Sequence, residues 1–254
     1  MDVDSDASSS TDTAGQKRSK VDEAASDKEA EVDAGLLVSN FRISPSTAAS
    51  LEKRGIKALF PIQAATFDAI LDGQDMLARA RTGTGKTLAF SLPMIERLAL
   101  DAATPSSHAP ASRMPKIIVM APTRELARQV AAEFESISGS LKVLTVYGGV
   151  AYDEQNRGLR QGVDVVIGTP GRIVDHMERG TLRFENIRFV CLDEADQMLD
   201  IGFADAMEKV LQCIQEQKAA QANAPTHQTL LFSATLPEWV HKVVRKYLKP
   251  DHQM

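Results

Sequence analysis

Short, nearly continuous apolar runs alternate along the chain with longer segments of helical pattern. The runs are rich in β-branched residues, as strands buried on both faces are. Between the runs, apolar residues recur at helical spacing, for example on one face of residues 203–214. Alternating strands and helices predict an α/β fold: a parallel sheet with helices on both faces. The predicted strands are 76–78, 117–121, 143–147, 163–167, 189–192 and 229–232.

Two polar segments, 101–115 and 215–225, are predicted to be surface loops. In an open parallel sheet, ligands bind beyond the carboxyl ends of the strands. Residues that carry chemistry should therefore come directly after the apolar runs.

A glycine-rich segment follows the first run and precedes a helical pattern over 88–100. Its glycines let backbone N–H groups turn around phosphate oxygens, and the helix start adds partial positive charge. We predict that Lys86 reaches the β- and γ-phosphates and that Thr87 binds Mg²⁺. Ala80 replaces the first glycine of the general phosphate-loop pattern, and the competing interpretation is a glycine-rich turn with an unrelated lysine. The segment reads Ala80-Arg81-Thr82-Gly83-Thr84-Gly85-Lys86-Thr87.

An acidic segment, Asp193-Glu194-Ala195-Asp196, directly follows the run 189–192. Three carboxylates at one strand end would repel one another unless a cation lies among them. Asp193 is predicted to hold Mg²⁺ and Glu194 to orient and deprotonate an attacking water. A solvated acidic turn is the alternative, and the phosphate loop on the same sheet edge favours nucleotide hydrolysis.

Charge is distributed unevenly between the first residues and the rest of the chain. Residues 1–35 hold ten acidic and four basic residues and no aromatic residue, which predicts a disordered acidic tail. The net charge of the tail is −6 and that of the whole chain is −5. Residues 36–254, the predicted folded domain, therefore have a net charge of +1. Any nucleic-acid binding should therefore rest on individually placed groups and not on a broad basic field.

The remaining compositional signals concern the compartment. The two cysteines are too few for a disulfide framework, and no apolar run approaches the roughly 18 residues of a membrane span. We expect a reducing compartment and no membrane partner. The cluster Lys17-Arg18-Ser19-Lys20 could belong to a nuclear import signal or be a solvated basic cluster. His176 is expected at the surface, and Trp239 is expected to pack a helix onto the sheet.

Six motifs together resemble the first domain of the DEAD-box family of ATP-dependent RNA helicases. The resemblance covers residues 41–250 and implies a RecA-like P-loop NTPase domain that couples RNA-stimulated ATP hydrolysis to local unwinding of RNA duplexes. In chain order the motifs are Ala80–Thr87, Pro122-Thr123-Arg124-Glu125-Leu126-Ala127, Gly148-Gly149, Thr169-Pro170-Gly171-Arg172, Asp193-Glu194-Ala195-Asp196 and Ser233-Ala234-Thr235.

The resemblance assigns roles residue by residue. Gln63 would read the adenine edge with Phe41 stacked on the ring, and Asp196, Ser233 and Thr235 would couple the nucleotide to RNA strand separation. A sequence-independent grip on the RNA backbone is implied for a set of loop residues: Pro122, Thr123, Arg124, Gly148, Gly149, Thr169, Gly171 and Arg172.

One segment departs from the family pattern. Leu59 and Phe60 stand where a proline and a serine or threonine are usual before Gln63. The variant Leu59-Phe60-Pro61-Ile62-Gln63 is similar to the nucleolar RNA helicase II (Gu) branch, which implies a nuclear and nucleolar protein, with the cytoplasm as the alternative.

Family members carry a second, C-terminal RecA-like domain that completes the ATP site and the RNA track. The present sequence contains no second phosphate-loop pattern, so we expect that domain to be absent from it. Two hypotheses remain open: a helicase represented by its ATP-binding half, or a non-catalytic module that binds ATP or RNA and competes with a complete helicase.

Overall fold

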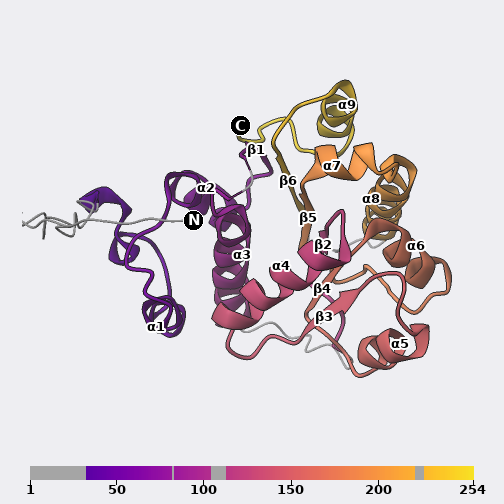
Figure 1. Ribbon diagram of the computed structural model, residues 1–254, viewed down its shortest axis with the longest axis horizontal. Coiled ribbons are helices and arrows are strands. Elements are labelled where there is room, and N and C mark those ends of the chain that lie inside the picture. Colours follow the sequence, from indigo (N-terminus) through magenta and orange to yellow (C-terminus); the bar gives the residue numbers. More distant parts are fainter. Residues whose placement is uncertain (1–32, 82, 104–112, 221–225) are drawn as a thin grey trace, which may run out of the picture. The chain divides into compact units, whose positions relative to one another are not determined.

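A six-stranded, fully parallel sheet forms the centre of the computed structural model, which describes residues 33–81, 83–103, 113–220 and 226–254 (Figure 1). The strands are β1 (Met76–Arg79), β2 (Ile117–Met120), β3 (Val143–Val146), β4 (Val165–Gly168), β5 (Phe189–Asp193) and β6 (Gln228–Ser233). Their spatial order is β1-β6-β5-β2-β4-β3. Each predicted run became a strand, with ends shifted by no more than two residues, and the α/β prediction is confirmed.

Helices cover both faces of the sheet, as Figure 1 shows. The first face carries α1 (Pro45–Lys53), α2 (Pro61–Leu71), α3 (Lys86–Ala103) and α4 (Arg124–Ile137). The second face carries α5 (Tyr152–Arg160), α6 (Pro170–Glu178), α7 (Ala195–Asp200), α8 (Ala204–Ala219) and α9 (Glu238–Tyr247). Two short 3-10 turns, Ala34–Leu36 and Val38–Asn40, precede α1.

The alternation of side chains along each strand explains why the runs are apolar throughout. In β2, Ile117 and Val119 pack into the core on the first face, and Ile118 and Met120 pack into the core on the second. All four are fully buried. A strand covered on both faces needs apolar residues at every position, which is the pattern seen in the sequence.

Some local expectations need correction. Residues 215–219, predicted as a loop, continue α8, because Gln, Glu, Lys and Ala are good helix formers even when the segment is polar. His176, expected at the surface, is fully buried. Trp239 is half-buried against the second core, as expected. Most of the predicted acidic tail, residues 1–32, lies outside the described part of the chain.

None of the helices within the described residues is long and apolar enough to cross a membrane.

Candidate functional site

All six motifs lie at one edge of the sheet, because each one follows the carboxyl end of a parallel strand. The strand order divides them into two groups. Neighbours β1, β6 and β5 end in the phosphate loop, the Ser233–Thr235 motif and the acidic segment. The next strands, β2, β4 and β3, end in the motifs with predicted RNA contacts. The predicted nucleotide and RNA residues therefore occupy adjacent halves of one edge.

The phosphate loop leads from β1 into α3, whose first residue is Lys86. Gly83 and Gly85 have φ angles of 82° and 81°, a left-handed conformation that glycine adopts without strain. Thr84 closes the turn by donating its hydroxyl to the Arg81 carbonyl at 2.8 Å. The described residues of the loop therefore turn at two glycines, as the prediction of a phosphate loop supposes. Thr82 lies outside the described residues.

Lys86 and the acidic segment meet across this half of the site. Lys86 is 7% exposed, and its Nζ lies 3.4 Å from Oε1 of Glu194. Thr87 is half-buried in the first turn of α3. The side chains that were predicted to bind phosphate and to activate water are therefore neighbours and neutralise each other without a ligand.

Asp193 has the environment expected of a cation ligand. It is 2% exposed, and within the described residues its Oδ1 atom is buried without a hydrogen-bond partner. Burial raises the pKa of Asp193 to about 7, although Lys86 nearby lowers it. A buried carboxylate oxygen with no partner is costly unless it is protonated or meets a cation. Asp193 and Thr87, both oxygen donors, fit a Mg²⁺ ion brought in with nucleotide phosphates.

The third acidic residue, Asp196, has its own partner, Thr235. Its Oδ2 accepts hydrogen bonds from the backbone N–H and the hydroxyl of Thr235, at 2.8 and 2.9 Å. Its own N–H donates to Ser233 Oγ at 3.2 Å. Burial alone would raise the pKa of Asp196, but these hydrogen bonds outweigh it and hold that pKa below its usual value. Two of the three carboxylates thus have partners of their own, Glu194 with Lys86 and Asp196 with Thr235, whereas Asp193 Oδ1 has none within the described residues.

Ser233 also contacts the start of the phosphate loop. Its carbonyl accepts from the N–H of Ala80 at 3.0 Å, and it is fully buried. One residue therefore touches both the phosphate loop and the acidic segment, and its predicted coupling role stays a prediction.

The two predicted adenine-binding residues have different surroundings. Gln63 accepts from the Phe60 N–H at 2.8 Å and donates to the Gly85 carbonyl at 3.1 Å, so its amide already lies on the phosphate loop. Phe41 packs edge-on against Phe67, with ring centroids 5.4 Å apart. The structure brings Gln63 to the nucleotide half of the site, and it gives Phe41 a partner in the core.

Phe60 stands out in the sequence only because a serine or threonine is usual at its position before Gln63. Its side chain is among the exposed large apolar groups, at 57%. A Cβ built on Gly85 would lie 2.7 Å from Phe60 Cδ2 and 2.4 Å from Gln63 Nε2. An exposed aromatic ring therefore lies against the phosphate loop beside Gln63.

The predicted RNA residues converge on the turn after β3. Arg124 lies over Gly149: a Cβ at that glycine would be 3.3 Å from both terminal guanidinium nitrogens. Arg172 donates to the Val150 carbonyl at 3.4 Å. Three separate motifs thus meet around one glycine turn, with Gly148 facing open space.

The other predicted RNA residues differ in their accessibility. The Thr123 hydroxyl caps α4 by accepting from the Leu126 N–H at 3.1 Å. Thr169, at the start of α6, donates its N–H to the Val146 carbonyl at 3.1 Å. Gly171 is exposed, whereas Pro122 is buried. Pro122 is therefore the least accessible of these candidates.

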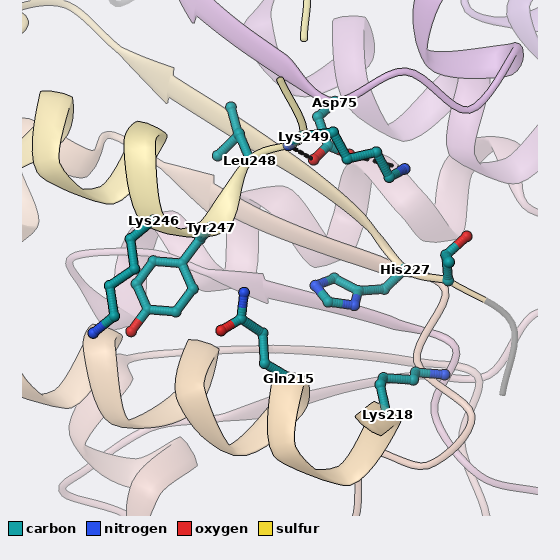
Figure 2. Close-up of a pocket in the computed structure, with 9 residues that line it drawn as sticks. Asp75, Gln215, Lys218, His227, Lys246, Tyr247, Leu248 and Lys249 are labelled. Atoms are coloured by element: carbon teal, nitrogen blue, oxygen red, sulfur yellow. Dashed lines mark hydrogen bonds and ion pairs between the residues drawn. The ribbon is translucent and has the colours of Figure 1, made fainter. Parts of the chain in front are cut away.

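A hollow of about 470 Å³ lies at the opposite, amino-terminal edge of the sheet (Figure 2). Asp75, before β1, and His227, before β6, line it. Lys249 donates its N–H to Asp75 Oδ2 at 2.8 Å and pairs through Nζ at 3.3 Å, so these charges tie the C-terminal segment to the sheet. No residue predicted for the site lines this hollow.

The sequence is similar to those of known proteins. The family described as DEAD/DEAH box helicase matches residues 60–243. Human ATP-dependent RNA helicase DDX50 is 48% identical over 215 residues, which are 85% of this chain and 28% of that protein. Nucleolar RNA helicase 2 of Rattus norvegicus is 46% identical over 215 residues, 85% of this chain and 26% of that protein.

A solved structure shares the fold. The crystal structure of a DEAD box protein from the hyperthermophile Methanococcus jannaschii aligns with a TM-score of 0.72 and 34% identity. The alignment covers 86% of this chain and 55% of that one. The present chain spans about a quarter to a third of the length of the curated relatives it matches.

Proposed function

Because this chain belongs to the DEAD/DEAH box helicase family, we propose that it is the ATP-binding part of an ATP-dependent RNA helicase. One observation carries the proposal: the strands that lead into the nucleotide motifs lie next to the strands that lead into the RNA motifs, so all the motifs lie at one edge of the sheet. Hydrolysis at one half can then act on RNA at the other through β5 and β2, which pair directly.

The nucleotide half supplies three actions. The phosphate loop binds the phosphates through backbone N–H groups, with Lys86 as the cation nearest the β- and γ-phosphates. Asp193 and Thr87 hold Mg²⁺, which supplies charge neutralisation of the phosphates when bound. When Lys86 leaves Glu194 to bind phosphate, the Glu194 carboxylate is free to accept a proton from the attacking water. Gln63 recognises adenine, since an amide can donate and accept along one base edge.

The RNA half contacts the sugar–phosphate backbone. Arg124 contacts Gly149 and Arg172 contacts the adjacent Val150, where the two arginines can pair with RNA phosphates. Backbone contact is independent of base sequence. The near-neutral folded part is consistent with a grip made by a few placed groups.

The complete reaction requires more than this domain in our proposal. A second RecA-like domain would cover the exposed sheet edge and provide further cationic groups for the transition state, worth about 10³–10⁵ in rate for an arginine finger in related NTPases. We also propose a nuclear or nucleolar location, supported by the name of the rat relative.

The decisive experiment measures ATP hydrolysis with and without single-stranded RNA, by this chain alone and after addition of a second RecA-like domain. We expect RNA-stimulated turnover in the combined sample and its loss in Glu194→Gln. Binding of ATP and RNA without any turnover in the combined sample would favour the alternative, a non-catalytic competing module. Equal stimulation by DNA would contradict the RNA assignment.

A further inference from the structure

A buried polar network lies between α5 and α6, next to the Gly148-Gly149 turn for which RNA contacts are proposed. His176 on α6 is fully buried, and its Nδ1 lies 2.9 Å from the Thr181 hydroxyl. Its Nε2 lies 3.4 Å from Oε1 of Gln155 on α5. Gln155 in turn donates through its amide to the carbonyl of Tyr147 at 3.1 Å. Tyr147 immediately precedes the Gly148-Gly149 turn.

Part of this network has a fixed direction. The Tyr147 carbonyl needs a donor, so the NH₂ group of Gln155 faces it and the Gln155 oxygen faces His176. That oxygen can accept only from a protonated Nε2 of His176. The Thr181 hydroxyl donates to the His176 carbonyl at 3.0 Å and also contacts His176 Nδ1 and the Tyr152 hydroxyl, the latter at 3.0 Å. These contacts connect Tyr152 through Thr181 and His176 to the Gly148-Gly149 turn.

The same tyrosine also contacts the arginines of α6. The Tyr152 ring stacks on His176 with centroids 4.4 Å apart and planes 19° from parallel. The Arg179 guanidinium lies 4.4 Å from the centre of that ring, and Arg172 lies 5.9 Å from it. Arg172 also donates to the Val150 carbonyl. The network therefore reaches both partners of the RNA grip, the glycine turn and Arg172.

We propose that His176 is a positioning residue for RNA binding, which acts through Gln155 and Tyr152 to fix the Gly148-Gly149 turn relative to Arg172. This inference rests on the proposed RNA contacts of those two motifs. Successive phosphates are held at a set spacing, so groups that contact them bind best when their separation is fixed beforehand. Gly148 and Gly149 have no side chains of their own that could fix the turn, and the turn follows β3, an outer strand of the sheet.

The test is a titration of a fluorescently labelled single-stranded oligouridylate with this chain at several salt concentrations. His176→Phe keeps a ring and removes both hydrogen bonds. We expect RNA binding to weaken by about five- to fiftyfold, the worth of one or two buried hydrogen bonds. The slope of log Kd against log salt should fall by about 0.7, the share of one phosphate contact in single strands, towards that of Arg172→Ala. His176→Gln keeps a donor within reach of Gln155 and should recover much of the affinity.

A matched control separates positioning from stability. Gln228 is buried, and its amide donates to two backbone carbonyls at the opposite edge of the sheet, those of Ile70 and Gln74. Gln228→Leu should lower the midpoint of thermal unfolding without changing RNA affinity or its salt slope. If His176→Phe does the same, the inference is overturned.

Two further variants make the outcome definite. Gln155→Met keeps side-chain volume and removes the hydrogen bonds to Tyr147 and to His176 while leaving the His176 ring in place, so it should reproduce the loss if His176→Phe does not fold. Normal RNA affinity in Gln155→Met would overturn the inference. Arg124→Ala tests the proposed function itself: if it leaves RNA binding unchanged, the RNA surface is wrongly placed. A loss in Arg124→Ala with no loss in the network variants would refute the positioning role alone.

Discussion

At the scale of single residues, Glu194 has the most unusual conformation. Among the described residues it is the one non-glycine residue with a positive φ, 55°, at the start of α7. A left-handed conformation costs an ordinary residue roughly 1–2 kcal/mol. Such strain persists where the surrounding structure fixes it, and it is concentrated at functional sites. The conformation directs a carboxylate towards Lys86 from a strand end that also carries Asp193.

The first prediction concerns this carboxylate. Glu194→Gln removes the proton acceptor and weakens the contact with Lys86. ATP should bind at least as tightly, because Lys86 no longer exchanges an anionic partner for phosphate. Turnover should fall by about 10²–10⁴-fold, the usual worth of a positioned general base. Titration with ATP and single-turnover hydrolysis with RNA, after addition of a second domain, measure the two effects. Glu135→Gln, on the exposed side of α4, is the control, and near-normal hydrolysis in Glu194→Gln would transfer the role to another group.

The second prediction concerns Phe60. Its exposed ring beside Gln63 and Gly85 is placed to contact the base of a bound nucleotide. Phe60→Ala should weaken ATP binding by about 1–3 kcal/mol, the range for stacking of a base on an aromatic side chain. Phe60→Tyr should bind like the parent. Calorimetric titration decides, and equal affinity for all three proteins would remove Phe60 from the site.

At the scale of elements, much of the architecture could be predicted because a buried parallel strand has a simple signature. Residues such as Ile117–Met120 are apolar at every position, and their ends locate the motifs. Side-chain partners could not be predicted in this way. The pairing of Lys86 with Glu194 depends on the order of the strands in the sheet, and the burial of His176 depends on how α5 and α6 pack together. Spacing along the chain encodes neither. Phe60 was visible as a departure, but its contact with Gly85 depends on the turn before α2.

The third prediction concerns pH and the packing of α5 against α6. Burial, followed by repulsion from Arg172, lowers the pKa of His176 from 6.5 to about 4. Between these values the unfolded chain binds a proton that the folded protein excludes, so the stability contributed above pH 6.5 is lost as pH falls through 4. The free energy of unfolding should drop by about 1–2 kcal/mol from pH 7 to pH 5 on this account.

Urea unfolding at both pH values checks this prediction in the parent and in His176→Gln. The variant should lose part of the pH dependence. His227→Gln is a useful comparison, because burial also lowers the pKa of His227 to about 4. An unchanged pH dependence in His176→Gln would contradict the assignment.

At the scale of the whole molecule, strand order separates two binding functions along one edge. The fourth prediction follows: in titrations with one ligand at a time, a substitution in one half should leave the affinity of the other half for its ligand unchanged. Lys86→Ala should weaken ATP binding by about 1.5–3 kcal/mol, the range for a hydrogen bond to a charged group, and leave RNA binding alone. Arg124→Ala should weaken RNA binding across all sequences and leave ATP binding alone. Loss of both affinities in either variant would show that the halves are not independent.

The two outer strands of the sheet also differ in how their free sides are covered. Beside β1, Met76 forms a bridge with Gln253, whereas β3 pairs only with β4 within the described residues. The first three residues of β3 are only half-buried. Unpaired, partly exposed strands are the first to open in local fluctuations, well below the free energy of global unfolding. Amide hydrogens of Val143–Val146 should therefore exchange with deuterium faster than those of Phe189–Asp193. The Gly148-Gly149 turn follows β3, so local opening of β3 would release bound RNA while the nucleotide half of the sheet stays folded.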